Sequence, residues 1–343
     1  MDDASHNPTS ENHAPKSPPA PPDRGHLLTE QRLPRSRDLD ALPVAEVLRV
    51  INEQDALVPA VVAEAIPQIA AVVERVVESL RSGGRLIYIG AGTSGRLGVL
   101  DASEIPPTFH APPGQIVGII AGGDAALRTS SEGREDEWDG AHAEFERLNV
   151  SSLDTVIGIA AGGTTPYVLG GLDLARQRGA TTALVCCVTR EQLTAPPTTA
   201  SAAAQTVAIA PRQSRAIAAI QHLISLPVGP EVVTGSTRMK AGTATKLALN
   251  MITTAAMVQL GKVWGNLMVD MKASNDKLRD RAARFISSQT GLPREQAMDL
   301  LGSAGGSVKL ALVMAKRNVG PDEARQLLRT SNQKLRPLLG APD

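Results

Sequence analysis

The sequence predicts an α/β fold, in which a parallel sheet carries helices on both faces and a small helical region follows at the C-terminal end. Short apolar runs without polar alternation recur along the chain, and such runs are typical of strands covered on both sides. Between them lie stretches with apolar residues at helical spacing, such as Pro166–Arg178. This alternation indicates parallel β-α-β units, whose ligands bind outside the carboxyl ends of the strands.

The N-terminal part divides into a leader and a helical region. Residues 1–26 are rich in Pro, Ser, Asn and His and lack the apolar segment of a secretory signal, so we expect a disordered leader. Residues 27–82 are expected to be helical, because apolar side chains recur at helical spacing from Pro43 to Leu80. The pattern predicts two helices, and the pair Gly83-Gly84 ends it.

The middle part, residues 83–285, is expected to hold the sheet. It also predicts an amphipathic helix over Arg215–Leu226 and a longer helix over Arg238–Leu260. The last part, residues 286–343, predicts two or three short helices that form a small helical domain. The predicted strands are Arg85–Gly90, Gln115–Gly123, Thr155–Gly163, Thr181–Val188 and Thr206–Pro211.

The composition excludes several classes of partner. Lysine plus arginine and aspartate plus glutamate are equal in number, at 35 each, so no overall field attracts nucleic acid or an anionic membrane. Cys186 and Cys187 are neighbours in an apolar run, which indicates buried, reduced thiols, because a disulfide framework or a metal site needs spaced cysteines. No apolar run reaches the ~20 residues of a membrane helix. We therefore expect a cytoplasmic protein without a membrane or nucleic-acid partner.

The stretch Gly90–Arg96, which reads GAGTSGR, joins a predicted strand to a predicted helix. Free backbone N–H groups at such a helix start favour an anion. The letters also match the dinucleotide fingerprint, in which an acidic residue about 20 positions after the turn binds the ribose. Here the acidic residues of the predicted helix come too early in the sequence for that role, and Asp124 comes too late. The hydroxyls of Thr93 and Ser94 favour the phosphate of a sugar phosphate, unless they simply cap the helix. A second turn, Ala161–Pro166, ends another strand and could meet the same ligand.

Several long blocks of the sequence resemble one known family. They read IYIGAGTSGRLGVLDASEIPPTF, GIIAGGD, SEGREDE, VGPEVVTGSTRMKAGTATKLALNMI and GKVWGNLMVDMKASNDKL. Over about Thr29 to Leu339 the chain is similar to the N-acetylmuramic acid 6-phosphate etherases. The resemblance implies a sugar isomerase (SIS) domain flanked by helices, a small helical C-terminal domain, a homodimer, and no metal or cofactor. It also implies cleavage of the D-lactyl ether of a sugar phosphate, giving N-acetylglucosamine 6-phosphate and D-lactate.

Three places depart from the family pattern. The second turn usually reads A-S-G-R-T-P, so Gly162 and Thr164 stand where relatives carry a serine and an arginine. Phosphate binding is therefore expected to be weaker, unless Thr164 or Thr165 compensates. The loop after the cysteine strand usually reads C-N-P-G-S and here reads C-V-T-R-E. Residues 212–226 intervene where relatives pass almost directly from I-A-P to V-G-P-E-V, and we expect a surface insertion there.

Cleavage of an ether in this way needs an acid and a base. Once the sugar is open, its C1 aldehyde acidifies the hydrogen at C2; a base removes that hydrogen, an acid protonates the departing lactate oxygen at C3, and water then adds. By resemblance Glu104, in D-A-S-E-I-P-P, is the proton donor, although its position alone is typical of an ordinary helix-end carboxylate. Glu135 matches the second carboxylate of the pattern E-G-x-E-D and is the expected base, with Asp136 as the alternative. Without the resemblance this segment reads as a solvated charge run.

The block Gly235–Lys240 has hydroxyls and cations at a predicted helix start, where they bind phosphate or the lactyl carboxylate, or merely cap the helix. Glu231 precedes this block and is expected to reach the sugar. Two other functions stay open: a non-catalytic sugar-phosphate sensor, slightly favoured by the missing serine, and an aldose–ketose isomerase. Retention of an acid and a base favours the etherase. The residues expected to bind the substrate or its phosphate are Gly92, Thr93, Ser94, Gly95, Gly163, Thr164, Thr165, Glu231, Ser236, Thr237 and Lys240.

Overall fold

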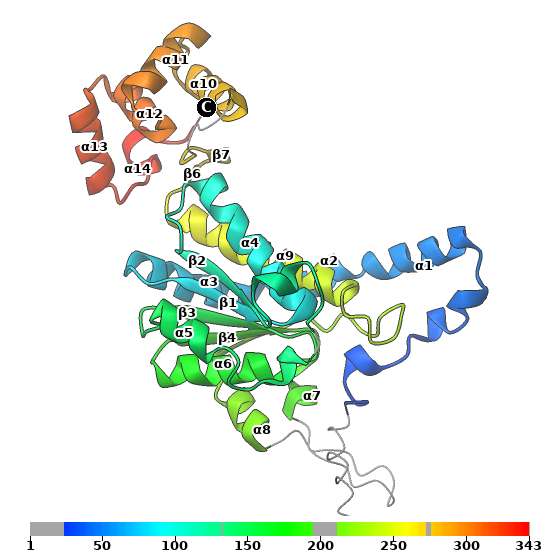
Figure 1. Ribbon diagram of the computed structural model, residues 1–343. Helices are drawn as coiled ribbons and strands as arrows, with labels where there is room; N and C mark the ends of the chain where they lie inside the picture. The colour runs from blue at the N-terminus through cyan, green and yellow to red at the C-terminus, as the bar shows by residue number, and fades with distance from the viewer. Residues whose placement is uncertain (1–23, 132, 195–210, 272–275, 343) are drawn as a thin grey trace, which may run out of the picture.

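The computed structural model describes residues 24–131, 133–194, 211–271 and 276–342 (Figure 1). Within these ranges the main sheet has five strands in the order β2-β1-β3-β4-β5, and every neighbouring pair is parallel. Helices cover both faces of this sheet, so the predicted fold class is confirmed. The strands are β1 (Leu86–Gly90), β2 (Ile116–Ile120), β3 (Thr155–Ile159), β4 (Thr181–Cys186) and β5 (His222–Ser225).

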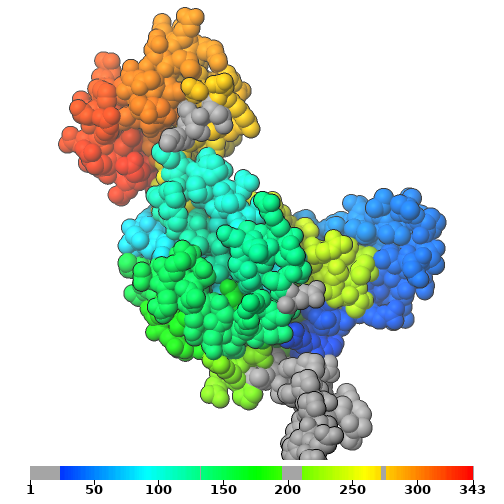
Figure 2. All heavy atoms as spheres, in the orientation of Figure 1, coloured from blue at the N-terminus to red at the C-terminus, as the bar shows by residue number. Residues whose placement is uncertain are grey.

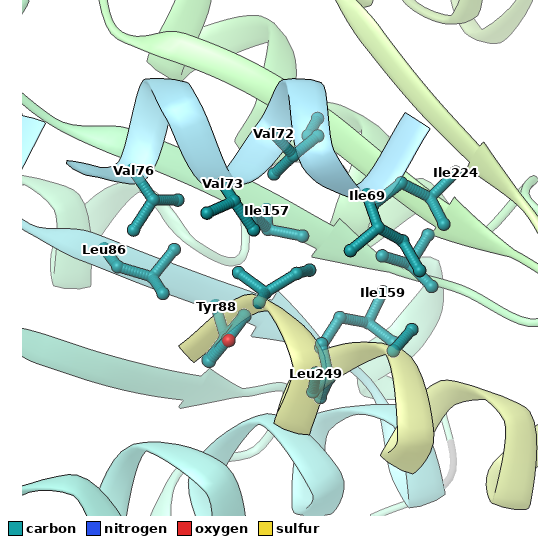
Figure 3. Packing of buried hydrophobic residues seen from close by; sticks show 14 of the residues in the cluster. Ile69, Val72, Val73, Val76, Leu86, Tyr88, Ile157, Ile159, Ile224 and Leu249 are labelled. Carbon is teal, nitrogen blue, oxygen red and sulfur yellow. The ribbon is translucent and has the colours of Figure 1, made fainter. Parts of the chain in front are cut away.

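The two faces of the sheet pack against different helices, because successive side chains of a strand point to opposite sides. Tyr88 of β1 belongs to the core cluster on one face, where side chains of α3 such as Val72 and Val76 point at the strands (Figure 3). Ile89, the next residue of β1, belongs to the cluster on the other face. The first cluster contains α2 (Val58–Glu64), α3 (Ile66–Arg81), α4 (Gly92–Phe109) and α9 (Lys240–Gln259), and the second contains α5 (His142–Leu148), α6 (Pro166–Gln177), α7 (Arg190–Thr194) and α8 (Pro211–Ala218).

The first four predicted strands are confirmed, but the fifth is not where the sequence predicted it. The helix predicted over Arg215–Leu226 is wrong: α8 ends at Ala218, and His222–Ser225 form the edge strand β5 beside β4. The apolar residues of two short elements fall at helical spacing by coincidence, which periodicity alone does not resolve. The strand predicted over Thr206–Pro211 lies outside the described residues except for Pro211, which begins α8.

The segment 212–226 is part of the folded core, so its prediction as a surface insertion is also wrong. Ile224 is fully buried and belongs to the first core cluster. Ala216 and Ile217 are buried in the second cluster, on the opposite face of the sheet. The segment therefore extends the sheet by one strand and covers part of it with a helix.

Before the sheet, the described residues form three α-helices where the sequence predicted two. The helices are broken at their prolines, because Pro59 and Pro67 lie in the first turns of α2 and α3, and proline is tolerated there but not inside a helix. Helix α1 (Val44–Asp55) forms an arm that projects from the body (Figures 1 and 2). Among the described residues no single helix is long and apolar enough to cross a membrane. One bent pair of segments, Val44–Glu64 with Ile66–Arg81, has the length and the composition of a membrane span, but these are the only features that it shares with one.

The C-terminal part is helical, as predicted (Figure 1). It has a core cluster of its own. Trp264 and Val269 belong to this cluster, so it starts before the helices do. The division of the chain at residue 286 stays a prediction; helix α10 runs through that position. The elements are β6 (Val263–Trp264), β7 (Leu267–Met268), α10 (Asp276–Thr290), α11 (Arg294–Ser303), α12 (Val308–Arg317), α13 (Pro321–Thr330) and α14 (Arg336–Leu339).

Candidate functional site

The first glycine turn joins β1 to α4 and holds the helix start close to the strand. A Cβ on Gly95 would lie 2.6 Å from Cγ1 of Ile120 and 2.8 Å from the carbonyl oxygen of Gly90, so only glycine fits there. Gly92 begins α4 with a φ of +52°, a conformation that other residues rarely adopt. No described atom lies within 4 Å of where a Cβ on Gly92 would be, so the turn faces open space.

The start of α4 presents backbone N–H groups that no described side chain caps. The first N–H groups of a helix lack partners inside the helix, and the helix dipole makes this end positive. Thr93 and Ser94, both half-buried, stand in this first turn, while the N-cap position is taken by Ala91. This geometry favours an anion over the capping role considered for the two hydroxyls.

The second glycine turn joins β3 to α6 and has the same form. Gly163 has a φ of +71°, and Thr165 is the N-cap of α6, although its side chain makes no capping hydrogen bond within the described residues. Thr164 is buried, and its carbonyl oxygen accepts a hydrogen bond of 2.8 Å from Nε2 of Gln213. A Cβ on Gly162 would be 3.6 Å from both Cδ1 of Leu27 and the Oγ1 of Thr29, an ordinary contact distance, so the turn has room for a serine.

Contacts between distant segments bring the two turns to one edge of the sheet. Cγ2 of Thr93 lies 3.6 Å from where a Cβ on Gly242, in the first turn of α9, would be. Cys187, directly after β4, donates its N–H to Ala161 at 2.8 Å and has its Sγ 3.6 Å from the carbonyl oxygen of Ala241. The loops after β1, β3 and β4 and the start of α9 therefore meet at the carboxyl edge, where this fold places ligands.

Glu231 caps helix α9 with its side chain. Its two carboxylate oxygens accept the backbone N–H groups of Lys240 and Ala241 at 3.0 and 2.9 Å. The side chain is almost fully buried, and burial raises its pKa above the ordinary value for glutamate. Ser236 and Thr237, in the block Gly235–Lys240, lie just before this helix and are half-buried. Helix capping, one of the two roles considered for that block, is performed by Glu231. A contact between Glu231 and a substrate stays a prediction.

Lys240 faces the arm and not the open edge. Its side chain is buried, and its ammonium group donates to Oε1 of Gln54 in α1 at 2.9 Å. Burial lowers the pKa of Lys240 below the ordinary value for lysine. The structure thus uses this cation to hold α1 against the start of α9, and its predicted contact with substrate stays a prediction.

The segment just after the leader, which the sequence analysis gave no role, lies beside the site. Thr29 is buried, with its Oγ1 3.6 Å from where a Cβ on Gly162 would be, and it donates to Glu30 at 3.2 Å. The Oε2 of Glu30 lies 3.8 Å from where a Cβ on Gly235 would be. Leu27 is buried in the core cluster of the same face as α6. The adjacent leucines 27 and 28 in an otherwise polar stretch were the only sequence signal for this docking.

Arg96, the last residue of the first turn motif, supports the loop after β2. Its guanidinium donates to the carbonyl oxygens of Leu127 and Ala126 at 3.1 and 2.7 Å. This loop leads to the 3-10 turn Arg134–Asp136, which packs against α6 and exposes both Glu135 and Asp136 to solvent. The loop that carries the predicted base starts at the carboxyl end of β2, the same edge of the sheet as the glycine turns.

Glu104 lies away from that edge. It is exposed on α4, 104 − 92 = 12 residues after Gly92, which corresponds to about 18 Å along the helix axis. There it lines a cavity of about 340 Å³ between α4 and α9, together with Lys246 and Asn250. The structure therefore brings the glycine turns, the G-S-T block and the loop of Glu135 together, and it does not bring Glu104 of the same chain to them.

Metal ligands do not gather within the described residues: no group of three or more His, Cys, Asp or Glu side chains stands close enough to hold an ion. Cys186 and Cys187 are free and buried, as the sequence predicted. The groups available at the edge are backbone N–H groups, hydroxyls and carboxylates. The expectation of no cofactor stays a prediction.

Comparison with known proteins gives close relatives over nearly the whole chain. A relative from Synechococcus sp. (strain CC9605), N-acetylmuramic acid 6-phosphate etherase, is 49% identical over 93% of this chain and 94% of its own. A relative of the same name from Rubrobacter xylanophilus is 46% identical over 89% and 93%. Residues 68–176 match the family model of the glucokinase regulatory protein N-terminal SIS domain. Among solved structures, a phosphoheptose isomerase from Francisella tularensis matches with a TM-score of 0.45 and 15% identity, over 64% of this chain and 100% of its own.

Proposed function

The chain belongs to the N-acetylmuramic acid 6-phosphate etherase family, and we propose that it cleaves the D-lactyl ether at C3 of N-acetylmuramic acid 6-phosphate. The products are N-acetylglucosamine 6-phosphate and D-lactate, so the enzyme is a carbon–oxygen lyase of amino-sugar recycling. Identity of 46–49% to relatives of this name, over about nine tenths of the chain, is the observation that carries the proposal.

The phosphate of the substrate binds between the two glycine turns. Open N–H groups and the hydroxyls of Thr93 and Ser94 support this from one side. The start of α6, with Thr164 and Thr165, supports it from the other. A monoester held there places the sugar over the carboxyl edge, where the loop of Glu135 runs.

Catalysis follows from one base and one acid. Glu135 removes the C2 hydrogen of the opened sugar, whose aldehyde stabilises the charge that forms. Glu104 protonates the C3 oxygen as the bond to lactate breaks, and water then adds at C3. Each of these groups is worth about 10²- to 10⁴-fold in rate.

The site is completed by a second copy of the chain. About 18 Å of helix separates Glu104 from the phosphate turn, and a hexose phosphate is much shorter than that. A homodimer in which Glu104 of the partner subunit faces the glycine turns removes this conflict. An exposed apolar side chain at the α4–α9 groove supports such a contact, since Leu100 of α4 lines this groove and is 48% exposed.

The expected setting of this enzyme is the cytoplasm. Two neighbouring cysteines that are free and buried support a reducing compartment. The partners that we propose are therefore the sugar phosphate and a second copy, with no membrane and no nucleic acid.

The test is to incubate the purified protein with N-acetylmuramic acid 6-phosphate in H₂¹⁸O. We expect D-lactate to form and the label to enter the sugar at C3. Label in the lactate would mean that the other C–O bond breaks, which contradicts the elimination. Binding without lactate would indicate the sugar-phosphate sensor, and interconversion of aldose and ketose without lactate would indicate the isomerase.

A further inference from the structure

The cavity between α4 and α9 has a polar side that the proposed roles do not fully use. Besides Glu104, it is lined by Lys246 and Asn250 of α9, which stand four residues apart and so lie on the same face of that helix. Both side chains are exposed. An acid, a cation and an amide thus open into one space of about 340 Å³.

Lys246 is not committed to the fold in the way that Lys240 is. Lys240 is buried and bonded to Gln54, whereas Lys246 has no hydrogen bond or ion pair among the described residues. A lysine at a surface ordinarily stays in solvent, but here it stands at a cavity beside two carboxyl groups, those of Asp101 and Glu104. Lys246 interacts electrostatically with Asp101, but no hydrogen bond or ion pair among the described residues fixes its ammonium group, so this group can reach an anion that enters the cavity.

The carboxyl group on the floor of the cavity already has partners in the fold. Asp101 is buried, and it accepts hydrogen bonds from the hydroxyl groups of Tyr88 at 3.0 Å and Thr253 at 3.1 Å. Burial raises the pKa of Asp101 above its ordinary value, although the two hydroxyl groups and the charge of Lys246 act in the opposite direction. Part of the remaining wall is apolar, and Leu97, Leu100 and Leu249 provide a surface for a methyl group.

We propose that Lys246 and Asn250 bind the carboxylate of the lactyl group, so that this cavity holds the leaving group while Glu104 protonates its ether oxygen. The lactyl group has a carboxylate, a methyl group and an ether oxygen, and the cavity offers a cation with an amide, an apolar wall and an acid. This inference rests on the proposed function, and it assigns specificity for the lactyl ether to side chains that are separate from the phosphate turns. Lys246 and Asn250 are then specificity residues, which touch the substrate but move no proton.

The test compares two ligands that differ only in the lactyl group. N-acetylglucosamine 6-phosphate has the same phosphate and sugar as the substrate but no carboxylate. For Lys246→Met we expect KM for N-acetylmuramic acid 6-phosphate to rise about 10- to 100-fold, the range for loss of a charge-assisted hydrogen bond. The inhibition constant of N-acetylglucosamine 6-phosphate should stay within about twofold, because this ligand does not reach the lysine. Lys246→Arg should restore most of the affinity, since the charge is kept.

Arg317→Met is the matched control, because it removes an exposed cation from α12 in the C-terminal helical part. It should leave both constants unchanged. An unchanged KM in Lys246→Met would overturn the inference, and so would a parallel rise of both constants, which would place the lysine at the phosphate or the sugar ring. If the wild type forms no lactate, the proposed function fails; the two dissociation constants, measured by calorimetry, then decide the inference on their own.

Discussion

Gly92 and Glu104 lie at opposite ends of one uninterrupted stretch of α4, about 18 Å apart along the helix axis. A helix is too stiff to bring them together, so the phosphate turn and the proposed acid act on one substrate only if they come from different copies. This relationship makes the homodimer a requirement of the proposed mechanism and gives that proposal a direct test.

Two inactive variants should restore activity when they share a dimer. Ser94→Asp places a negative charge in the proposed phosphate site, while a carboxylate near a helix start stabilises the helix. Glu104→Gln removes the acid. A mixed dimer has one site with both defects and one intact site, so random mixing in equal amounts should recover about a quarter of wild-type lactate release.

The control for this mixture is Ser94→Asn, which keeps the size of the side chain without the charge. It should retain most of the activity by itself. If the mixture of Ser94→Asp and Glu104→Gln stays as inactive as either variant alone after subunit exchange, both groups act within one chain, and the shared site is wrong.

The acid and the base should separate by isotope exchange. In D₂O, Glu104→Gln is expected to exchange the C2 hydrogen of the substrate for deuterium while it releases lactate about 10²- to 10⁴-fold more slowly, because the base remains and the acid is gone. Glu135→Gln should lose the exchange and the lactate together. The measurement is mass spectrometry of recovered sugar. Loss of exchange in Asp136→Asn but not in Glu135→Gln would move the role of base to Asp136.

A serine at position 162 should strengthen phosphate binding. The structure has room for its Cβ, 3.6 Å from Leu27 and Thr29, and one added hydrogen bond of about 0.5–1.5 kcal/mol corresponds to a KM about two- to tenfold lower. The matched control is Gly163→Ser, whose Cβ would lie 2.4 Å from Cδ2 of Leu193 at a φ of +71°, and which should instead lower the melting temperature. An unchanged KM in Gly162→Ser would show that the missing hydroxyl has no consequence.

The pair Arg85 and Asp154 should make stability depend on pH. Asp154 is buried, and burial by itself raises its pKa. Its carboxylate accepts hydrogen bonds from the Arg85 guanidinium, at 3.0 and 2.8 Å, and from the N–H of Ser151. These contacts outweigh burial, so the pKa of Asp154 lies below the ordinary value. A lowered pKa contributes stability that is present above the ordinary pKa of aspartate and is lost as the pH falls through the folded-state value. Asp154→Asn should therefore cost about 3 kcal/mol of unfolding free energy at pH 7, and less below about pH 4.

Urea denaturation of the wild type and Asp154→Asn at a series of pH values measures this difference. The exposed Asp139 gives the control, because its ion pairs with His142 and Arg212 lie in solvent, and Asp139→Asn should change stability by less than about 1 kcal/mol. A gap between wild type and Asp154→Asn that widens toward acid would contradict the assigned direction.

The strands and the glycine turns could be predicted because their causes are local. Four unbroken apolar runs gave four buried strands, and Gly92 and Gly163 stand where the backbone needs a positive φ. The edge strand His222–Ser225 was missed for an equally local reason: it is short, and with α8 it imitates the spacing of one helix.

The sequence by itself determined the fold class, the family and the two turns, because hydrophobic pattern, glycine positions and long motif blocks act through neighbouring residues. Only the tertiary structure decided which polar side chains serve the fold and which stay exposed at a cavity. Lys240 bonds Gln54, which is 186 positions away, and Glu231 caps α9, while Lys246 stays at an open cavity. The partners of a buried charge come from whichever segments the packing brings beside it, and no spacing along the chain specifies them.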